Sequence, residues 1–129
     1  MNIPGDLLYT KDHEWIRVEG GQGHIGISDF AQAHLGDIVF VELPEFAQVE
    51  QGQAIGVIES VKAAATMFCP AGGTIVAVNE ELEESPELLN EDCYATWIAI
   101  IELSGPADLE ALMDAATYTE YCRQAEAED

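Results

Sequence analysis

Alternating apolar and polar residues run through most of the chain before its last quarter. The segments 14–19 (EWIRVE) and 23–28 (GHIGIS) alternate in this way on either side of GGQG. Such alternation is typical of half-buried strands, and a glycine-rich turn between two of these runs predicts a β-hairpin. Further strands are expected over 37–44, 54–60, 63–70, 72–79 and 97–103.

Helical patterns occupy three shorter parts of the sequence. Residues 28–36 (SDFAQAHLG) predict a short helix, because Ser28 suits an N-cap and Gly36 can end it. Ser85 followed by Pro86 predicts another helix start. C-terminal helices are expected over about 106–125, with a change of phase near Asp114, from the helical spacing of the apolar residues Leu109, Leu112, Met113, Ala116, Tyr118, Tyr121 and Cys122.

These elements together predict a mainly β fold. Many short strands followed by helices favour a β-sandwich or a small flattened barrel with appended helices. A hydrophobic content of 48% is typical of a folded globular protein. Because no linker or low-complexity tract divides the chain, we expect a single domain over 1–129.

The formal net charge of −21 argues against partners that are themselves strongly negative. Nucleic acid and anionic membrane surfaces would both be repelled, and the chain has no basic patch to offset this. No apolar run reaches the length that spans a bilayer. The charge is compatible with solubility alone, or with electrostatic steering toward partners that carry basic docking surfaces.

Cysteine usage and the N-terminus both favour a cytoplasmic protein. The three cysteines are widely and irregularly spaced and form no CxxC pair, so neither a thioredoxin-like redox site nor a zinc site is expected, and we expect reduced, structural thiols. The first residues, MNIPGDLLYTKDHEW, lack the features of a signal peptide or a transit peptide.

Lys62 is one of only four basic residues, against twenty-five acidic ones. It lies in VIESVKAAAT (57–66), between two strand-like runs that leave two or three residues for a turn. That spacing places Lys62 at the tip of a tight hairpin between Val61 and Ala63. From the residues alone, an ordinary surface lysine and a lysine presented for modification both remain open.

The whole segment GVIESVKAAATMFCPAGGTIVAVN resembles the lysine-bearing hairpin of the glycine cleavage system H protein family. The resemblance also includes YTKDHEWIRVE, GISDFAQAHLGDIVFVELP and NEELEESPELLN, so it covers nearly the whole chain in order. Its most diagnostic piece is 59–63 (ESVKA). Biotin-carrier domains place methionines on both sides of the lysine, and lipoyl domains of 2-oxo-acid dehydrogenases usually place an aspartate before it.

The resemblance implies a lipoyl-domain-like fold, a barrel-sandwich hybrid of two antiparallel sheets with short helices and a helical C-terminus. It implies that lipoate is joined to Lys62 in amide linkage by a lipoylating enzyme. The turn that this enzyme recognises would then consist of Glu59, Ser60, Val61 and Ala63.

By the same resemblance the protein is a carrier and not an enzyme. It would take the aminomethyl group of glycine from the P protein, a pyridoxal-phosphate glycine decarboxylase, to the T protein, a folate-dependent aminomethyltransferase. The L protein, a dihydrolipoyl dehydrogenase, would reoxidise the arm. Two other functions remain open, an H-like relay that donates lipoyl groups to other complexes and an unmodified β-sandwich binding module.

In the family the loaded arm folds into a cleft on the carrier's own surface, and two residues are candidates for it here. Glu14 would pair with the cationic amine, and His34 would line the cleft from the short helix. The alternatives are that Glu14 is a solvated strand residue and that His34 only finishes its helix. The other histidines are expected at the surface and the two tryptophans in the core: His13, His24, Trp15 and Trp97.

Four positions depart from the usual pattern of the family without touching the lysine turn. Ala47 stands where glycine is common, Gly72 where serine is, Cys93 where proline is and Thr96 where glycine is. These differences concern the loops near 47 and 93–96 and the way a partner docks there.

Overall fold

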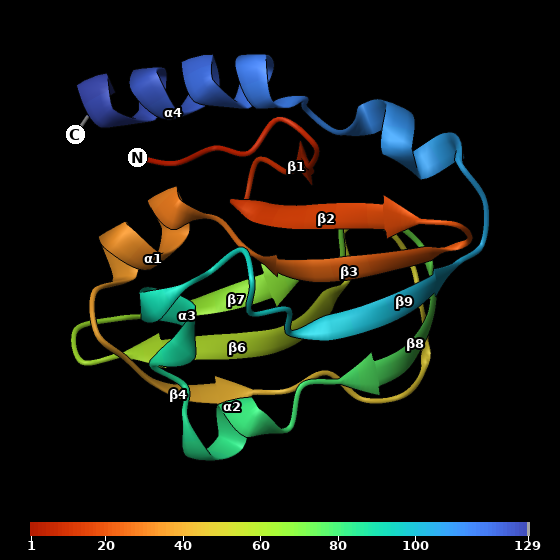
Figure 1. Ribbon diagram of the computed structural model, residues 1–129, viewed down its shortest axis with the longest axis horizontal. Helices are drawn as coiled ribbons and strands as arrows, with labels where there is room; N and C mark the ends of the chain where they lie inside the picture. Colours follow the sequence, from red (N-terminus) through yellow and green to blue (C-terminus); the bar gives the residue numbers. More distant parts are fainter. Residues whose placement is uncertain (129) are drawn as a thin grey trace.

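The computed structural model describes residues 1–128 and contains two antiparallel sheets (Figure 1). The larger sheet has six strands in the order β1-β2-β3-β9-β8-β5, and the smaller has three in the order β4-β6-β7. The strands of the larger sheet are β1 Leu8–Tyr9, β2 Glu14–Glu19, β3 Gln22–Ile27, β9 Ala99–Leu103, β8 Gly73–Val78 and β5 Gln48–Val49. Those of the smaller sheet are β4 Ile38–Glu42, β6 Ala54–Ser60 and β7 Ala64–Phe68. The predicted mainly β fold of two antiparallel sheets is therefore confirmed.

Short helices connect the strands, and a longer one ends the chain. They are α1 Asp29–Leu35, α2 Glu81–Glu84, α3 Leu88–Glu91, the 3₁₀ helix η1 Ala107–Ala111 and α4 Ala115–Glu128. Figure 1 shows α4 lying alongside the N-terminal segment and β1, while α1 lies beside the turn that joins β6 to β7. No helix in residues 1–128 is long and apolar enough to cross a membrane.

The helix α1 has the two ends that its sequence predicts. The hydroxyl of Ser28 accepts the backbone N–H of Ala31 at 3.2 Å, which satisfies one of the unpaired donors of the first turn. Gly36 ends the helix with a φ of 78°, in a region that residues with a side chain seldom adopt. Both ends of α1 are thus set by local chemistry.

The structure differs from the sequence prediction in several short elements. The strand β1 was not expected, and neither was the short strand β5 within 45–53, which pairs with β8. The helix expected to start at Ser85 starts instead at Leu88, and Ser85 follows the unpredicted helix α2. Two-residue strands and single helical turns depend on tertiary neighbours more than on propensity, because so few residues carry a pattern.

Buried apolar side chains form three clusters. Two of them draw on the strands of the sheets, around Ile25 and Ile101 in one case and around Ile58 and Leu89 in the other. Each fully buried side chain of this size contributes about 1.5–3 kcal/mol to folding. All three cysteine thiols are free and buried: Cys69, Cys93 and Cys122.

The third cluster is aromatic and attaches α4 to the sheet. The rings of Tyr9 and Tyr118 stack in parallel with their centroids 4.4 Å apart. The Tyr118 hydroxyl lies 2.6 Å from Ser28 Oγ and 2.7 Å from His13 Nδ1. The 3₁₀ helix η1 and α4 are separated by a short extended segment, in which Met113 forms a backbone bridge with Tyr9. This break accounts for the change of helical phase near Asp114.

Ser28 therefore serves two elements at once, and we expect its loss to be costly. Ser28→Ala removes both the cap of α1 and the partner of the Tyr118 hydroxyl, and should lower the free energy of unfolding by about 1–2 kcal/mol. Urea denaturation measures the change. Ser85→Ala is the matched control, since Ser85 does not cap α3. Equal effects of the two substitutions would contradict the double role of Ser28.

Candidate functional site

The turn between β6 and β7 is closed by one serine. The Ser60 hydroxyl accepts the backbone N–H groups of Ala63 at 3.0 Å and Lys62 at 3.3 Å. It also lies 3.2 Å from the carbonyl oxygen of Ala63, which accepts the Ser60 N–H at 2.8 Å as well. A side chain that satisfies the backbone of its own turn restricts the conformations available to that turn.

This turn is also attached to the rest of the protein. The Val61 N–H donates to the carbonyl oxygen of Asp37 at 3.0 Å, just before β4. The side chains of Val61 and Lys62 nevertheless point into solvent, and Val61 is 70% exposed. The backbone that carries Lys62 is therefore held on both sides while its amine stays accessible.

The lysine side chain lies over the end of α1. A Cβ atom placed on Gly36 would come within 3.6 Å of Lys62 Cε. The stem of the lysine therefore lies within van der Waals reach of the end of α1. His34 lies two residues before this glycine, so the structure brings the predicted residues Lys62 and His34 to the same end of the protein.

His34 belongs to a stack of three rings. The Phe30 ring is stacked on His34 with centroids 4.0 Å apart and on His13 with centroids 4.4 Å apart. Two near-parallel rings at these distances must lie on opposite faces of Phe30. His34 is exposed on α1, and its Nδ1 lies 3.0 Å from the carbonyl oxygen of Phe30. His34 therefore contacts the backbone of α1 and also presents an exposed ring.

The expectation that His13 is a surface residue is wrong. Its ring is half-buried between Phe30 and the Tyr118 hydroxyl. Burial lowers the pKa of His13, and the nearby His34 lowers it further. Of the two tryptophans, Trp15 is fully buried as expected, whereas Trp97 is only partly so.

Glu14 is not a solvated strand residue, because only 2% of it is exposed. One carboxylate oxygen accepts the hydroxyl of Thr10, and the other accepts the backbone N–H of Phe68 at 3.1 Å. Burial raises the pKa of Glu14 to about 7, against the lowering effect of these two hydrogen bonds. A buried carboxyl whose pKa is shifted this strongly is a candidate for a functional group.

The Glu14 carboxylate and Lys62 lie toward opposite ends of β7. Lys62 precedes that strand, and Phe68, which contacts Glu14, is its last residue. At about 3.3 Å per residue, the segment from Lys62 to Phe68 spans at most about 20 Å. A ligand attached to the lysine would need this reach to meet the carboxylate.

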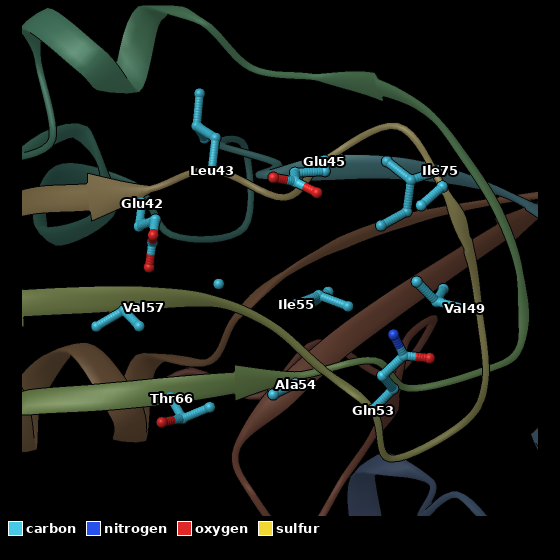
Figure 2. A pocket seen from close by; sticks show the side chains of 12 residues that line it. Glu42, Leu43, Glu45, Val49, Gln53, Ala54, Ile55, Val57, Thr66 and Ile75 are labelled. Atoms are coloured by element: carbon cyan, nitrogen blue, oxygen red, sulfur yellow. The ribbon is translucent and has the colours of Figure 1, made fainter.

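A separate groove of about 480 Å³ lies between β6 and the loop after β4 (Figure 2). Figure 2 shows Glu42 and Glu45 above it, with Ile55 and Val49 across the opening. Neither the lysine turn nor the two candidate cleft residues line it. This groove includes Ala47, one of the positions that depart from the family pattern.

Sequence reasoning missed the partners of the candidate residues. The sequence analysis did not predict that Thr10 and the Phe68 backbone would hold Glu14, or that His13 would pack in the same ring stack as His34. For the contact between Thr10 and Glu14, the only local signal is a hydroxyl four residues before a glutamate, and this signal is weak. The others join segments that are far apart in the chain, so no local pattern reveals them.

The comparisons with known proteins agree over nearly the whole chain. Residues 7–125 match the family model described as glycine cleavage H-protein. A glycine cleavage system H protein from Syntrophomonas wolfei is 57% identical over 125 residues, which cover 96% of each chain. One from Alkaliphilus oremlandii is 52% identical over 96% of this chain and 98% of its own.

A solved structure is similar as well. The crystal structure of a glycine cleavage system H protein from Mycobacterium marinum superposes with a TM-score of 0.83 at 36% identity. The superposition covers 96% of this chain and 99% of that one. The arrangement of two sheets and a C-terminal helix is thus shared with a protein of the same name as the sequence relatives.

The raised pKa of Glu14 predicts a pH-dependent cost to stability. Below its ordinary value of 4.5 the carboxyl is protonated in the folded and unfolded states alike. As pH rises from 4.5 to about 7, the unfolded chain ionises while the folded protein keeps the proton, so stability is lost and stays lost above 7. Glu14→Gln should therefore raise the free energy of unfolding by about 2–3 kcal/mol more at pH 8 than at pH 4.

Urea denaturation at the two pH values measures this difference. Glu83→Gln, at an exposed position on α2, is the matched control and should show little pH dependence. An effect of Glu14→Gln that is the same at pH 4 and pH 8 would mean that the carboxyl titrates normally in the folded protein.

Proposed function

Because this chain belongs to the glycine cleavage H-protein family, we propose that it is a carrier whose Lys62 holds lipoate in amide linkage. The observation that carries the proposal is the presentation of Lys62, exposed on a turn whose backbone is held by Ser60 and by the contact from Val61 to Asp37. An enzyme that modifies an amine needs it both accessible and reproducibly placed. A lysine on a mobile loop would meet only the first requirement.

The residues around Lys62 fit such a group. Lys62 is exposed, and the small, exposed residues Ala63 and Ala64 follow it in the turn and at the start of β7. When bound, lipoate supplies a dithiolane that accepts a group on one sulfur and is reoxidised afterwards. The protein supplies the anchoring point and thereby raises the local concentration of the arm at each docked partner.

The reach of the arm is compatible with Glu14 as its inner contact. A lipoyl-lysine carrying an aminomethyl group spans about sixteen bonds, or about 20 Å at roughly 1.2 Å per bond. This equals the longest path from Lys62 along β7 to Phe68. The amine of the cargo is cationic at neutral pH, and the buried Glu14 carboxylate is the natural group to accept its hydrogen bond.

The enzymes proposed to use this carrier are the P, T and L proteins of glycine cleavage and the lipoylating enzyme. The strong negative charge of the chain suits partners that present basic docking surfaces. In this scheme the T protein receives the aminomethyl group that the P protein loads, and the hard chemistry stays in the cofactors of the partners. The carrier's own residues anchor the arm and shield its cargo from water.

Lipoylation is expected at Lys62 and nowhere else. With lipoate and a lipoylating enzyme present, the intact mass should rise by one lipoyl group, and the formal charge should change from −21 to −22. Peptide mapping locates the group. Lys62→Arg should abolish the modification and leave the fold intact, because the side chain is exposed. Attachment at Lys11 would overturn the proposal.

Glu14 and His34 are expected to slow the loss of cargo from the loaded carrier. Removing the carboxylate deletes a charge-assisted hydrogen bond worth roughly 1.5–3 kcal/mol, so Glu14→Ala should speed the release of ammonia and formaldehyde about ten-fold or more. His34→Ala should act in the same direction with a smaller effect. Lipoylation and reoxidation by the L protein should stay near normal, because the unloaded arm carries no cation.

First-order decay of purified loaded protein measures these rates. His24→Ala is the matched histidine control, since His24 lies on β3 beside Trp97, outside the ring stack of His34. Decay rates of the Glu14 and His34 variants that equal the wild-type rate would remove both residues from the proposed cleft.

A further inference from the structure

The hydroxyl of Thr10 is the centre of the turn that precedes β2. It accepts the backbone N–H of Asp12 at 3.2 Å and that of Glu14 at 3.1 Å, and it donates to a carboxylate oxygen of Glu14. A hydroxyl has one proton to donate and two lone pairs to accept with. Both lone pairs of Thr10 Oγ1 are thus occupied by backbone donors, and its single proton is committed to Glu14.

Backbone hydrogen bonds also restrain this turn. The Thr10 N–H donates to the carbonyl oxygen of Glu14 at 3.0 Å, and the His13 N–H donates to that of Thr10 at 3.1 Å. His13 has a φ of 68°, which a residue with a side chain adopts only under constraint from its surroundings. Its carbonyl oxygen in turn accepts the N–H of Ser28 at 2.9 Å. Thr10 Oγ1 therefore has little freedom to leave Glu14.

The two carboxylate oxygens of Glu14 are held from different directions. Thr10 binds one of them from the turn before β2, and the Phe68 N–H binds the other from the end of β7. With both oxygens engaged, the plane of the carboxylate is set before any ligand arrives. A carboxylate oxygen can accept more than one hydrogen bond, so capacity for a cationic donor remains.

We propose that Thr10 is a positioning residue whose hydroxyl orients the Glu14 carboxylate to receive the cationic cargo of the lysine arm. The assignment rests on the proposed carrier function and goes beyond it, because Thr10 itself need not touch the arm. A preorganised acceptor loses less freedom when it binds its ligand, and this is the advantage that the Thr10 hydrogen bond supplies.

Thr10 also favours the ionised form of Glu14 in an environment that opposes it. Burial raises the pKa of this carboxyl, and the charge of the neighbouring Asp12 raises it further. Burial raises the pKa of the Cys69 thiol, just past β7, and the nearby Glu14 carboxylate raises it further. The hydroxyl of Thr10 and the N–H of Phe68 act in the opposite direction.

The test compares Thr10→Val with Thr10→Ser in the lipoylated and loaded carrier. Valine keeps the branched shape and loses the hydroxyl, whereas serine keeps the hydroxyl. Thr10→Val should lose its cargo about three- to ten-fold faster than wild type at pH 7, and Thr10→Ser less than two-fold faster.

A double substitution separates positioning from a general loss of structure. In a Glu14→Gln background, Thr10→Val should leave the decay rate unchanged, because the carboxylate that it orients is absent. Equal acceleration in both backgrounds would overturn the proposal, as would an effect of Thr10→Val that Thr10→Ser shares in full. Thermal denaturation of each variant identifies any that fails to fold.

The same measurements distinguish this proposal from the carrier function. No lipoylation of Lys62 would refute the carrier function itself. Accelerated decay of Glu14→Gln together with wild-type decay of Thr10→Val would refute only the role of Thr10. Wild-type decay of Glu14→Gln would remove the cargo contact and the role of Thr10 with it.

Discussion

The buried carboxylate of Glu14 joins the two sheets, and the geometry of the candidate site depends on it. Glu14 begins β2 in the larger sheet, and its side chain accepts the backbone N–H of Phe68 at the end of β7 in the smaller sheet. An unpaired carboxyl at such a depth would cost several kcal/mol, so its two hydrogen bonds are needed for the fold to tolerate it. The same burial raises its pKa to about 7. Stability alone would therefore favour an apolar side chain over Glu14 at this position.

The hairpin of β6 and β7 connects that carboxylate to the lysine. Lys62 lies at one end of β7 and Phe68 at the other, so in the proposed carrier the length of β7 would set the distance that an arm on Lys62 has to cover. Ser60 and Asp37 fix the backbone at the outer end. The inner end is fixed by Glu14. A rigid strand between an exposed anchor and a buried acceptor is what a carrier that both presents and protects its cargo requires.

The surroundings of the site are built by segments from both ends of the chain. Tyr118 on α4 contacts Ser28 and His13, and His13 stacks on Phe30, which stacks on His34. The C-terminal helix therefore supports α1, which carries His34 and ends beneath the lysine stem. This explains why a helix remote from Lys62 in sequence belongs to the same structural unit. Contacts of this kind rigidify a binding surface without lining it.

Elements whose signals are local could be predicted from the residues alone. Alternation predicted the hairpin of β2 and β3, Ser28 and Gly36 predicted both ends of α1, and the spacing around Lys62 predicted its place on a tight turn. Only the tertiary structure decided that Glu14 is buried, that Thr10 and Phe68 hold it, and that His13 is packed against Phe30. Phe68 lies 54 residues from Glu14, and Tyr118 lies 105 residues from His13. Caps and turns are set by hydrogen bonds within a few residues, whereas burial and the pKa shift that follows from it depend on which distant segments the fold brings together.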